Sequence, residues 1–499
     1  MADVILFRPN ISKMIDKALS PRPPWGLLFI AAPLIENNYS VKIIDEEINP
    51  YWADELDREL NDSTICVGVT SMTGWQILGG LQFSRAVKKK RPGIPVVWGG
   101  LHPSILPEQT IKNDFVDIVV RGEGEEPFLK IVTTLKGGGS IKEIPNVYSK
   151  ENGRVYSNPK NYFMDINKLS LLPYTMLEWG KYRRREPSTL PNCKLIIDIL
   201  ADRGCPHKCG FCYNLNVNNC AWRGLSANKI IEQIEYLKEK FLIDGINFLG
   251  DNFFVDKKRV SDVCAEIIKR KIEITWHADC RIDYFSRYDD KFINLLKESG
   301  CKVLTFGVES GSPRMLKLMQ KGISLDQIFK VNESLKKHQI GCSYHFMAGF
   351  PEETKEDLLQ TYTVMMKISD RYPEANFLGP SIYTPYPGTP LYDKCVEMGF
   401  KGPEKLEDWA NFGWDEKTSL TFMSPGYLRW MLKSVNVIKY ANIAKRVSGM
   451  KWVGWWFRLR AKVIIKFNII GPQPEVALVY FFNAVIIFMK KLFKFNTKK

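Results

Sequence analysis

The feature of this chain that most constrains its fold is a repeated alternation of short apolar segments with segments of helical length. The apolar segments of the first 140 residues span 4–7, 41–44, 65–69, 96–98 and 118–120. They are apolar throughout, as strands are in a parallel sheet that helices cover on both faces. Segments of helical length, such as 26–37 and 76–90, lie between them. The pattern predicts a doubly wound, Rossmann-like α/β domain over residues 1–140, whose ligand binds at the carboxyl ends of the strands.

A second series of the same kind begins near residue 195. Residues 141–194 contain a predicted hairpin around Asn152-Gly153, and we interpret this region as a linker. The predicted strands of the second series span 195–200, 246–249, 274–277, 303–307, 343–347 and 377–382. Six units of this spacing predict a partial (β/α)6 barrel over residues 195–400, with its active end at the carboxyl ends of the strands.

Cysteine usage points to metal binding. The chain has 11 cysteines, an odd and mostly isolated set, and its first residues lack the pattern of a signal peptide, so we expect a reducing, cytoplasmic location. Cys205, Cys209 and Cys212 form a C-x3-C-x2-C loop directly after the first predicted barrel strand. Three thiolates can hold three corners of an iron–sulfur cubane and leave one iron open. The alternative, a structural zinc site, needs a fourth ligand, for which His207 and Cys220 are the nearby candidates.

This cysteine loop, with the aromatic Phe211 before its last cysteine, resembles the signature of the radical S-adenosylmethionine (radical SAM) enzymes. Further motifs end the later barrel strands, at 249–253, 306–312, 347–354 and 384–390. The resemblance implies a [4Fe–4S] cluster on the three cysteines and a bound S-adenosylmethionine, with no catalytic acid or base assigned. The residues that it places at S-adenosylmethionine are Phe211, Gly250, Asp251, Asn252, Arg281, Glu309, Ser310 and Gly349. By resemblance, the 249–253 motif would receive the methionine amino group, Arg281 would lie near the carboxylate, and Glu309 and Ser310 would face the ribose.

The first domain resembles the cobalamin-binding domain that one radical SAM subfamily carries in front of its barrel. The residues that the resemblance places at cobalamin are Ser71, Met72, Thr73, Trp75, Gly99, Gly100, His102, Gly122, Glu123, Gly124 and Glu125. The first βα loop, residues 9–14, lacks the histidine of the pattern Asp-x-His-x-x-Gly, so no lower ligand of cobalt is assigned. His102 is either a cobalt ligand or a residue that caps a helix or lies beside a phosphate, and we favour the second role.

The resemblance implies an enzyme that reductively cleaves S-adenosylmethionine to a 5′-deoxyadenosyl radical and C-methylates an unactivated carbon. Its electron would come from an external donor of the flavodoxin or ferredoxin type. An alternative is a cyclase or C–C bond-forming enzyme that acts on a lipid or porphyrin. An RNA-modifying enzyme is disfavoured because the sequence shows no second cysteine trio, and we expect no nucleic-acid partner. The intact cysteine trio also disfavours a non-enzymatic cobalamin sensor.

The basic excess of the chain belongs to its last part. Of the formal net charge of +15, residues 445–499 supply +11, with twelve Lys and Arg against one acid, Glu475. Residues 452–470 mix Trp and Phe with these cations, and the apolar run 476–489 falls short of the about 20 residues that span a bilayer. After a helical extension over 401–444, we therefore predict a basic amphipathic tail at the cytoplasmic face of a membrane, which favours a hydrophobic, lipid-like substrate. The alternative is a helix that packs on the barrel with its basic face in water.

Overall fold

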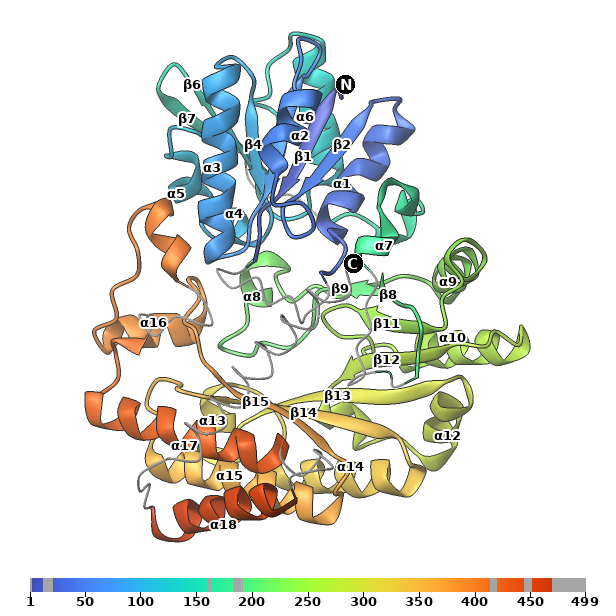
Figure 1. Cartoon of the computed structure of the whole chain (residues 1–499), viewed down its shortest axis with the longest axis vertical. Coiled ribbons are helices and arrows are strands. Elements are labelled where there is room, and N and C mark those ends of the chain that lie inside the picture. Colours follow the sequence, from blue (N-terminus) through green and yellow to red (C-terminus); the bar gives the residue numbers. More distant parts are fainter. Residues whose placement is uncertain are drawn as a thin grey trace, which may run out of the picture.

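A computed structural model describes residues 2–11, 21–158, 163–182, 190, 192–412, 420–443 and 451–468. Two sheets of parallel strands dominate it, one in the first third of the chain and one in the middle, and Figure 1 shows them stacked along the long axis of the molecule.

The first sheet has the strand order β2-β1-β3-β4-β5-β6-β7, and its first five strands are parallel. Its strands are β1 (Val4–Arg8), β2 (Val41–Asp45), β3 (Cys66–Thr70), β4 (Val96–Gly99), β5 (Ile118–Val120), β6 (Val147–Glu151) and β7 (Arg154–Ser157). The helices of this unit are α1 (Trp25–Glu36), α2 (Trp52–Glu59), α3 (Trp75–Lys90), α4 (Leu101–Ile105), α5 (Pro107–Ile111) and α6 (Glu125–Lys136). The five predicted parallel strands are confirmed.

Helices cover both faces of this sheet because its strands are apolar on both sides. Val4 and Leu6 of β1 belong to one cluster with side chains of α1 and α6, whereas Ile5 and Phe7 belong to another with side chains of α3. The doubly wound α/β architecture is therefore as the sequence predicts.

The sequence predicts the hairpin at Asn152-Gly153 as part of the linker 141–194, and that placement is wrong. Both turn residues have positive φ, as a two-residue hairpin turn requires, so β6 and β7 pair antiparallel. β6 also pairs antiparallel with β5, which continues the first sheet by two strands. The sequence identifies the hairpin but not its partner, because a turn motif carries no information about which edge the hairpin joins.

The second sheet is a six-stranded parallel sheet with the order β15-β14-β13-β12-β11-β8. Its strands are β8 (Ile196–Leu200), β11 (Gly245–Leu249), β12 (Thr275–Cys280), β13 (Cys301–Glu309), β14 (Gly341–Ala348) and β15 (Asn376–Ile382). Its main helices are α9 (Ala227–Phe241), α10 (Lys257–Lys269), α12 (Asp290–Glu298), α13 (Pro313–Leu318), α14 (Leu325–His338), α15 (Lys355–Arg371) and α16 (Pro390–Glu397). All six predicted strands are confirmed, and their sequential order is that of an open barrel.

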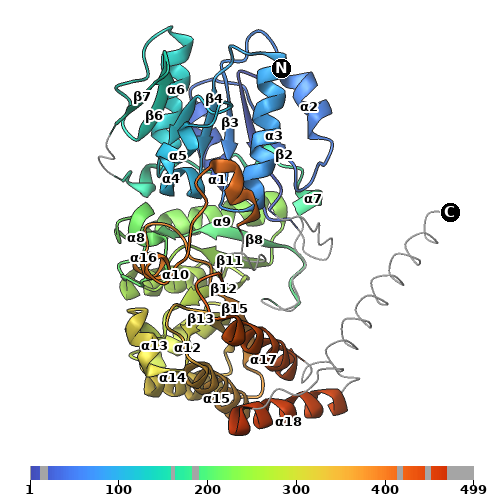
Figure 2. The same cartoon turned by 90° about the vertical axis from the view of Figure 1, so that its left-hand side faces the viewer.

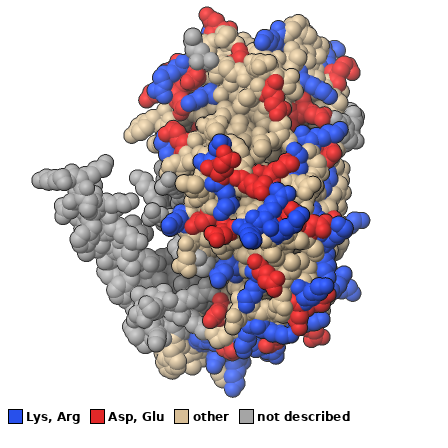
Figure 3. Space-filling view, turned by 90° about the vertical axis from the view of Figure 1, so that its right-hand side faces the viewer, with Lys and Arg blue, Asp and Glu red and all other residues tan. Residues whose placement is uncertain are grey.

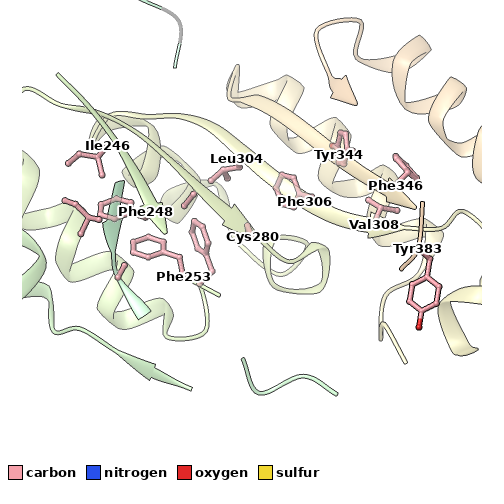
Figure 4. Close-up of a cluster of buried hydrophobic side chains, with 14 of the residues drawn as sticks. Ile246, Phe248, Phe253, Cys280, Leu304, Phe306, Val308, Tyr344, Phe346 and Tyr383 are labelled. Atoms are coloured by element: carbon pink, nitrogen blue, oxygen red, sulfur yellow. The ribbon is translucent and has the colours of Figure 1, made fainter. Parts of the chain in front are cut away.

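Alternate side chains of this sheet form the core beneath the helices. Phe306 and Tyr344 stack on that side with ring centroids 5.7 Å apart, and Figure 4 shows them among the buried side chains. The Tyr344 hydroxyl donates a hydrogen bond to Asn332 of α14, which identifies this face as the helix side. The intervening residues therefore point to the opposite, inner face of the barrel.

The segment after the barrel contacts both units. A 3-10 turn, η3 (Leu406–Asn411), reaches back to the first unit, where Trp409 donates a hydrogen bond to the Gln109 side chain of α5 at 2.6 Å. Helix α17 (Pro425–Ile443) then packs against the barrel, with the Tyr362 and Ser434 hydroxyls 2.8 Å apart. The segment thus joins the two units in addition to extending the chain.

Part of the predicted basic tail is a helix, α18 (Lys451–Phe467), that packs on the barrel. Phe457, Ala461 and Ile464 lie buried on one side of it, and Arg458 pairs with Asp370 of α15. The apolar run 476–489 lies outside the described residues. Among the residues that are described, none of the helices has the length and apolarity needed to cross a membrane. On the face that Figure 3 shows, acidic and basic side chains are intermixed, in keeping with the nearly balanced charge of residues 1–444.

Candidate functional site

The carboxyl ends of the two sheets meet around one cavity. The cavity measures about 310 Å³, and its walls come from β1, β3 and β4 and from α1 and α6. On the barrel side it is lined by Arg203 and Tyr213, which flank the cysteine loop, and by Asp251. Open parallel sheets bind ligands at this edge, and in the order 2-1-3-4-5 the crevice lies beside β1 and β3. The architecture therefore places the predicted ligand edge of one unit against that of the other.

Glycines form much of the wall on the side of the first sheet, which includes Gly99, Gly100, Gly122 and Gly124. A Cβ atom on Gly124 would come within 2.7 Å of the Ile30 side chain. Gly74 and Gly124 also precede α3 and α6, so no side chain caps these two helices. Backbone N–H groups at an uncapped helix start can bind phosphate, which suits a large planar cofactor with a phosphate-bearing tail.

Six of the predicted cobalamin residues line this cavity and five do not. Those that line it are Gly99, Gly100, Gly122, Glu123, Gly124 and Glu125. The other five are Ser71, Met72, Thr73, Trp75 and His102, which belong to the loop after β3, the start of α3 and the segment after β4. The roles assigned to these five at cobalamin stay predictions.

His102 is buried behind the cavity wall. Its Nδ1 atom is 3.0 Å from the Thr73 hydroxyl, and its ring lies against Trp409 from the segment after the barrel. Burial lowers the pKa of the imidazole to about 3, so His102 is neutral. Its Nε2 atom has no hydrogen-bond partner among the described residues.

The cysteine loop is held by hydrogen bonds to its backbone. Asn214 bonds twice to Cys205, accepting from its N–H at 3.1 Å and donating to its carbonyl at 2.6 Å. Asp251 accepts from the Gly204 N–H at 2.6 Å and from the Tyr213 hydroxyl at 2.9 Å. Gly204 has φ +80°, and a Cβ atom there would lie 1.8 Å from the Ala221 carbonyl oxygen, so only glycine fits. Asp251, predicted to face the methionine amino group, is thus engaged in shaping the loop.

Two donors approach the cysteine sulfurs. The Asn252 amide donates to Cys205 Sγ at 3.4 Å, and Arg281 Nη1 donates to Cys209 Sγ at 3.7 Å. Such donors stabilise a thiolate, whereas burial raises the pKa of Cys205 and raises that of Cys212 to about 12. These thiols therefore need a bound metal to ionise fully at neutral pH, and a cluster would supply it.

Within the described residues, no three His, Cys, Asp or Glu side chains come together closely enough to hold a metal ion. The three ligands of a cubane bind different irons and are spread wider than the ligands of one ion. The loop, its soft sulfur donors and the two N–H donors fit a cluster of that kind, and nothing in the described residues favours the tetrahedral zinc alternative.

The cysteine loop and the first unit are joined by a buried ion-pair network. Arg203, directly before Gly204, pairs with Glu125 at 2.5 Å and with Glu123 at 3.2 Å. Arg223 also pairs with Glu123, at 2.5 Å. All four side chains are at least four-fifths buried, so two predicted cobalamin residues are engaged in holding the cysteine loop against the cavity.

The other predicted S-adenosylmethionine residues differ in their surroundings. Phe211 packs near Phe350, with ring centroids 5.8 Å apart. Ser310 is fully buried and lies 3.1 Å from the Thr361 hydroxyl, which gives it a structural position before the start of α13. Gly349 has φ +88° and donates its N–H to Glu353 at 2.6 Å. Gly250 lies against the Asp202 side chain. A Cβ atom added to Gly250 would come within 2.3 Å of an Asp202 carboxylate oxygen.

Lys321 is a site residue that the sequence reasoning missed. Its ammonium pairs with Glu309 at 2.7 Å in a buried position and lies 5.6 Å from the centroid of the Phe211 ring. Its carbonyl accepts a hydrogen bond from Arg281 Nη2 at 2.6 Å. Lys321 follows α13 and no strand-end motif marks it, so only its contact with Glu309 reveals it.

Comparisons with known proteins agree with this arrangement. The family model described as the radical SAM superfamily matches residues 201–365, and that of the B12 binding domain matches residues 11–132. An uncharacterized methyltransferase of Pyrococcus horikoshii is 31% identical over 79% of this chain and 83% of its own length. The anaerobic magnesium-protoporphyrin IX monomethyl ester cyclase of Rubrivivax gelatinosus is 25% identical over 80% of this chain and 70% of its own length.

Two solved structures share the fold. The cobalamin-dependent S-adenosylmethionine radical enzyme OxsB, with aqua-cobalamin bound, superposes with a TM-score of 0.70 at 18% identity, over 96% of this chain and 75% of that one. The radical S-adenosylmethionine methyltransferase TsrM of Kitasatospora setae, with tryptophan and a SAM analogue bound, gives a TM-score of 0.66 at 18% identity, over 88% of each chain.

Proposed function

The chain belongs to the radical SAM enzymes that carry a B12-binding domain, and on this premise we propose that it C-methylates an unactivated carbon of a hydrophobic substrate. The observation that carries the proposal is the cavity of about 310 Å³ that the glycine-lined edge of the first sheet shares with Arg203 and Tyr213, the residues on either side of the cysteine loop. A methyl carrier bound at the first sheet and a radical source bound at the loop would face the same space. The methyltransferase of Pyrococcus horikoshii favours methyl transfer as the outcome.

Three cofactors fit the residues at this junction: a [4Fe–4S] cluster, S-adenosylmethionine and cobalamin. When bound, they supply the electron that cleaves S-adenosylmethionine to the 5′-deoxyadenosyl radical and the methyl group that the substrate gains. Cys205, Cys209 and Cys212 would hold the cluster. The N–H groups of Asn252 and Arg281 then offset negative charge on the sulfurs.

The protein's remaining contribution is orientation and exclusion of water. The Arg203 network fixes the cysteine loop against the first sheet, so the distance between the two cofactor edges is set by buried ion pairs. The Glu309 carboxylate, held by Lys321, offers an acceptor for ribose hydroxyls on the barrel side.

Ring closure or C–C bond formation without methyl transfer is the second candidate. It is favoured by the cyclase relative of Rubrivivax gelatinosus, and it would use the same cluster and S-adenosylmethionine site. The two outcomes differ in whether the methyl group of S-adenosylmethionine reaches the product.

The test is anaerobic turnover of the reconstituted full chain with S-adenosylmethionine deuterated in its methyl group, a low-potential reductant and a small-molecule cell extract. Mass spectrometry should find a product that carries the label, with formation of 5′-deoxyadenosine. A product that forms only with active enzyme and carries no label would replace methylation by the second candidate. Cys209→Ala should form neither 5′-deoxyadenosine nor the labelled product. Cys220→Ala, which changes a neighbouring cysteine outside the motif, is its matched control and should form both.

We also propose that the enzyme works at an anionic membrane surface, to which α18 is suited. The side of α18 that faces away from the barrel exposes Trp455, Leu459 and Phe467, by 64%, 39% and 58%. Lys462 and Lys466 lie exposed on the same side, so apolar and basic groups share one face. Trp and Lys in this arrangement favour the headgroup region of a bilayer. Figure 2 shows α18 at the end of the molecule away from the first sheet, so this contact would anchor the enzyme rather than open onto the cavity.

Co-sedimentation with vesicles of phosphatidylglycerol and phosphatidylcholine tests this second proposal. The full chain should sediment at low salt, and the double variant Trp455→Ser with Leu459→Ser should bind about tenfold more weakly. Tyr51→Ser, at a 74% exposed aromatic residue of the first unit, should bind as the unaltered chain does. Equal sedimentation of all three proteins would contradict an interface on α18.

A further inference from the structure

The contacts of Arg281 differ from the role that the family resemblance implies for it. Arg281 directly follows β12 and precedes α11 (Ile282–Phe285), and its side chain is only 11% exposed. The resemblance places it near the methionine carboxylate of S-adenosylmethionine. In the structure its guanidinium group has its partners within the protein, and one of them is a sulfur of the cysteine loop.

All three nitrogens of this guanidinium group donate to protein atoms. Nε donates to Asp283 Oδ1 at 2.8 Å, and Nη2 donates to the Lys321 carbonyl at 2.6 Å. Nη1 donates to Cys209 Sγ at 3.7 Å. A carboxylate that binds arginine takes parallel N–H groups from two of these nitrogens. Every such pair on Arg281 consists of nitrogens that already have a partner, so the side chain is fixed toward the sulfur and not left open for a carboxylate.

The segment that carries Arg281 contacts the cysteine loop at a second point. The Tyr284 hydroxyl of α11 lies 2.7 Å from Nε2 of His207, which stands between Cys205 and Cys209 in the loop. The rings of His207 and Tyr284 also lie close, with centroids 5.4 Å apart. Two residues three positions apart thus contact the same loop, which fixes the place of the guanidinium group relative to the sulfur.

The segment after α13 holds Arg281 and the cysteine loop together. The Met319 carbonyl accepts a hydrogen bond at 2.9 Å from the N–H of Gly210, the residue after Cys209. Two residues later, the Lys321 carbonyl accepts from Arg281, and the Lys321 ammonium pairs with Glu309. The guanidinium group therefore cannot leave Cys209 without breaking hydrogen bonds to other parts of the barrel.

A buried cation that donates to a cluster sulfur favours the reduced cluster. Reduction adds one electron, and so one negative charge, to the cluster and its thiolates. An N–H donor at a sulfur and a nearby positive charge both stabilise that added charge, and they do so more strongly where water is excluded. The buried Asp283 carboxylate, which pairs with Nε, opposes this effect in part.

We propose that Arg281 is a positioning residue of the cluster, which raises the reduction potential of the cluster through Cys209, and that it does not bind the methionine carboxylate. Asp283 limits the size of this effect. The inference rests on the proposed function in taking Cys205, Cys209 and Cys212 as the cluster ligands. It gives Arg281 the role of making the cluster easier for an external donor to reduce.

A potentiometric titration of the reconstituted full chain, followed by the electron paramagnetic resonance signal of the reduced cluster, tests this without S-adenosylmethionine. In Arg281→Met, the ratio of reduced to oxidised cluster at a fixed potential should fall about tenfold, which for one electron lowers the midpoint potential by about 60 mV. Asp283→Asn should raise the midpoint potential, because it leaves the Arg281 charge without its acid. A merely structural role of the pair would not give shifts of opposite sign.

A double variant separates the electrostatic effect from a folding defect. Arg281→Met combined with Asp283→Asn removes the ion pair as a unit and leaves no unpaired buried charge. Its midpoint potential should lie below that of Asp283→Asn, so the effect of Arg281 is measured even if Arg281→Met alone does not fold. Arg287→Met is the matched control, because Arg287 lies 3.8 Å from the same Asp283 but its side chain is 70% exposed. It should leave the potential unchanged, since water and salt screen an exposed charge.

Equilibrium dialysis of S-adenosylmethionine against the oxidised enzyme distinguishes the two roles of Arg281. The double variant should bind S-adenosylmethionine as tightly as the unaltered chain does. Equal potentials in the double variant and Asp283→Asn would overturn the proposal. A loss of S-adenosylmethionine affinity of about tenfold or more, as the loss of a charged carboxylate contact gives, would also overturn it. Failure of methyl transfer alone would leave both measurements unchanged, whereas a reconstituted chain without iron would overturn both this proposal and the proposed function.

Discussion

The two sheet edges that meet at the cavity are built on opposite principles. On the first sheet, α3 and α6 begin after Gly74 and Gly124, and no side chain caps them. On the barrel, α9, α10, α12, α13, α14, α15 and α16 each begin with a Ser, Thr or Asp side chain that accepts a backbone N–H. The first edge leaves backbone groups and space for a ligand, whereas the second satisfies its own backbone and presents side chains.

The two edges would therefore bind their ligands in different ways. Glycines at the first edge have no side chain, so a large cofactor can approach the backbone. Cysteine, asparagine and arginine at the second act by their donor atoms. Substitutions at the second edge should therefore abolish the binding of a cofactor, whereas substitutions at the first edge should lower the affinity for one gradually.

The largest effect is expected at the cysteines. Replacing Cys205, Cys209 and Cys212 together by Ala should remove the about four iron and four sulfide of the reconstituted protein, because thiolates are the cluster ligands. Iron and sulfide analysis after anaerobic reconstitution measures this, with Cys220→Ala as control. If the two edges act separately, cobalamin binding at the other edge persists in the triple variant. Iron retained in that variant would contradict the assignment of the cluster to these cysteines.

The next effect concerns the contact between the two edges. Arg203→Met removes the cation from two buried carboxylates, Glu123 and Glu125, and should lower the free energy of unfolding by about 3–5 kcal/mol. Urea denaturation followed by circular dichroism measures it. Lys258→Met, which removes an exposed ion pair on α10, should cost less than about 1 kcal/mol. Equal losses in the two variants would show that the Arg203 network does not hold the units together.

A third prediction uses a buried acid of the barrel edge. Glu353 is buried, and desolvation raises its pKa to about 7 in the folded chain from an ordinary value near 4.5. The folded state therefore binds the proton more tightly, and the stabilising effect, complete below about pH 4.5, is lost as pH rises toward 7.

As the pH is raised from about 5 to 8, the loss of this effect should lower the free energy of unfolding by on the order of 3 kcal/mol. Glu353→Gln should remove most of that pH dependence in urea titrations at several pH values. A variant whose stability falls with pH as steeply as that of the unaltered chain would contradict the assignment.

The smallest effect is expected at the glycine edge. Gly124→Val places a side chain where a Cβ atom already comes within 2.7 Å of Ile30, at the cavity wall. Cobalamin affinity should fall about tenfold, in line with the cost of overpacking, while iron content stays unchanged. Gly93→Val, at a glycine with open space around it, is the control in the same spectroscopic titration. Unchanged affinity in Gly124→Val would argue that the cofactor does not approach this wall.

The same contrast explains which parts of the fold and of the site can be predicted from the sequence. Strands such as 4–7 and 303–307 are predictable because short apolar runs between helical segments are typical of buried parallel strands, and the cysteine trio because its spacing is specific. The sequence cannot place the β6–β7 hairpin, because its pairing with β5 depends on chain geometry that a turn motif does not encode. Lys321 and the Arg203 network arise from contacts between distant segments.

The central claim is that one chain holds both cofactors at the two edges that meet at the cavity. Iron and cobalt analysis of a single preparation tests it most directly, on the full chain reconstituted anaerobically with iron, sulfide and cobalamin and then separated by gel filtration. The account predicts about four iron and one cobalt per chain. A protein that retains its iron in full and no cobalt would contradict it.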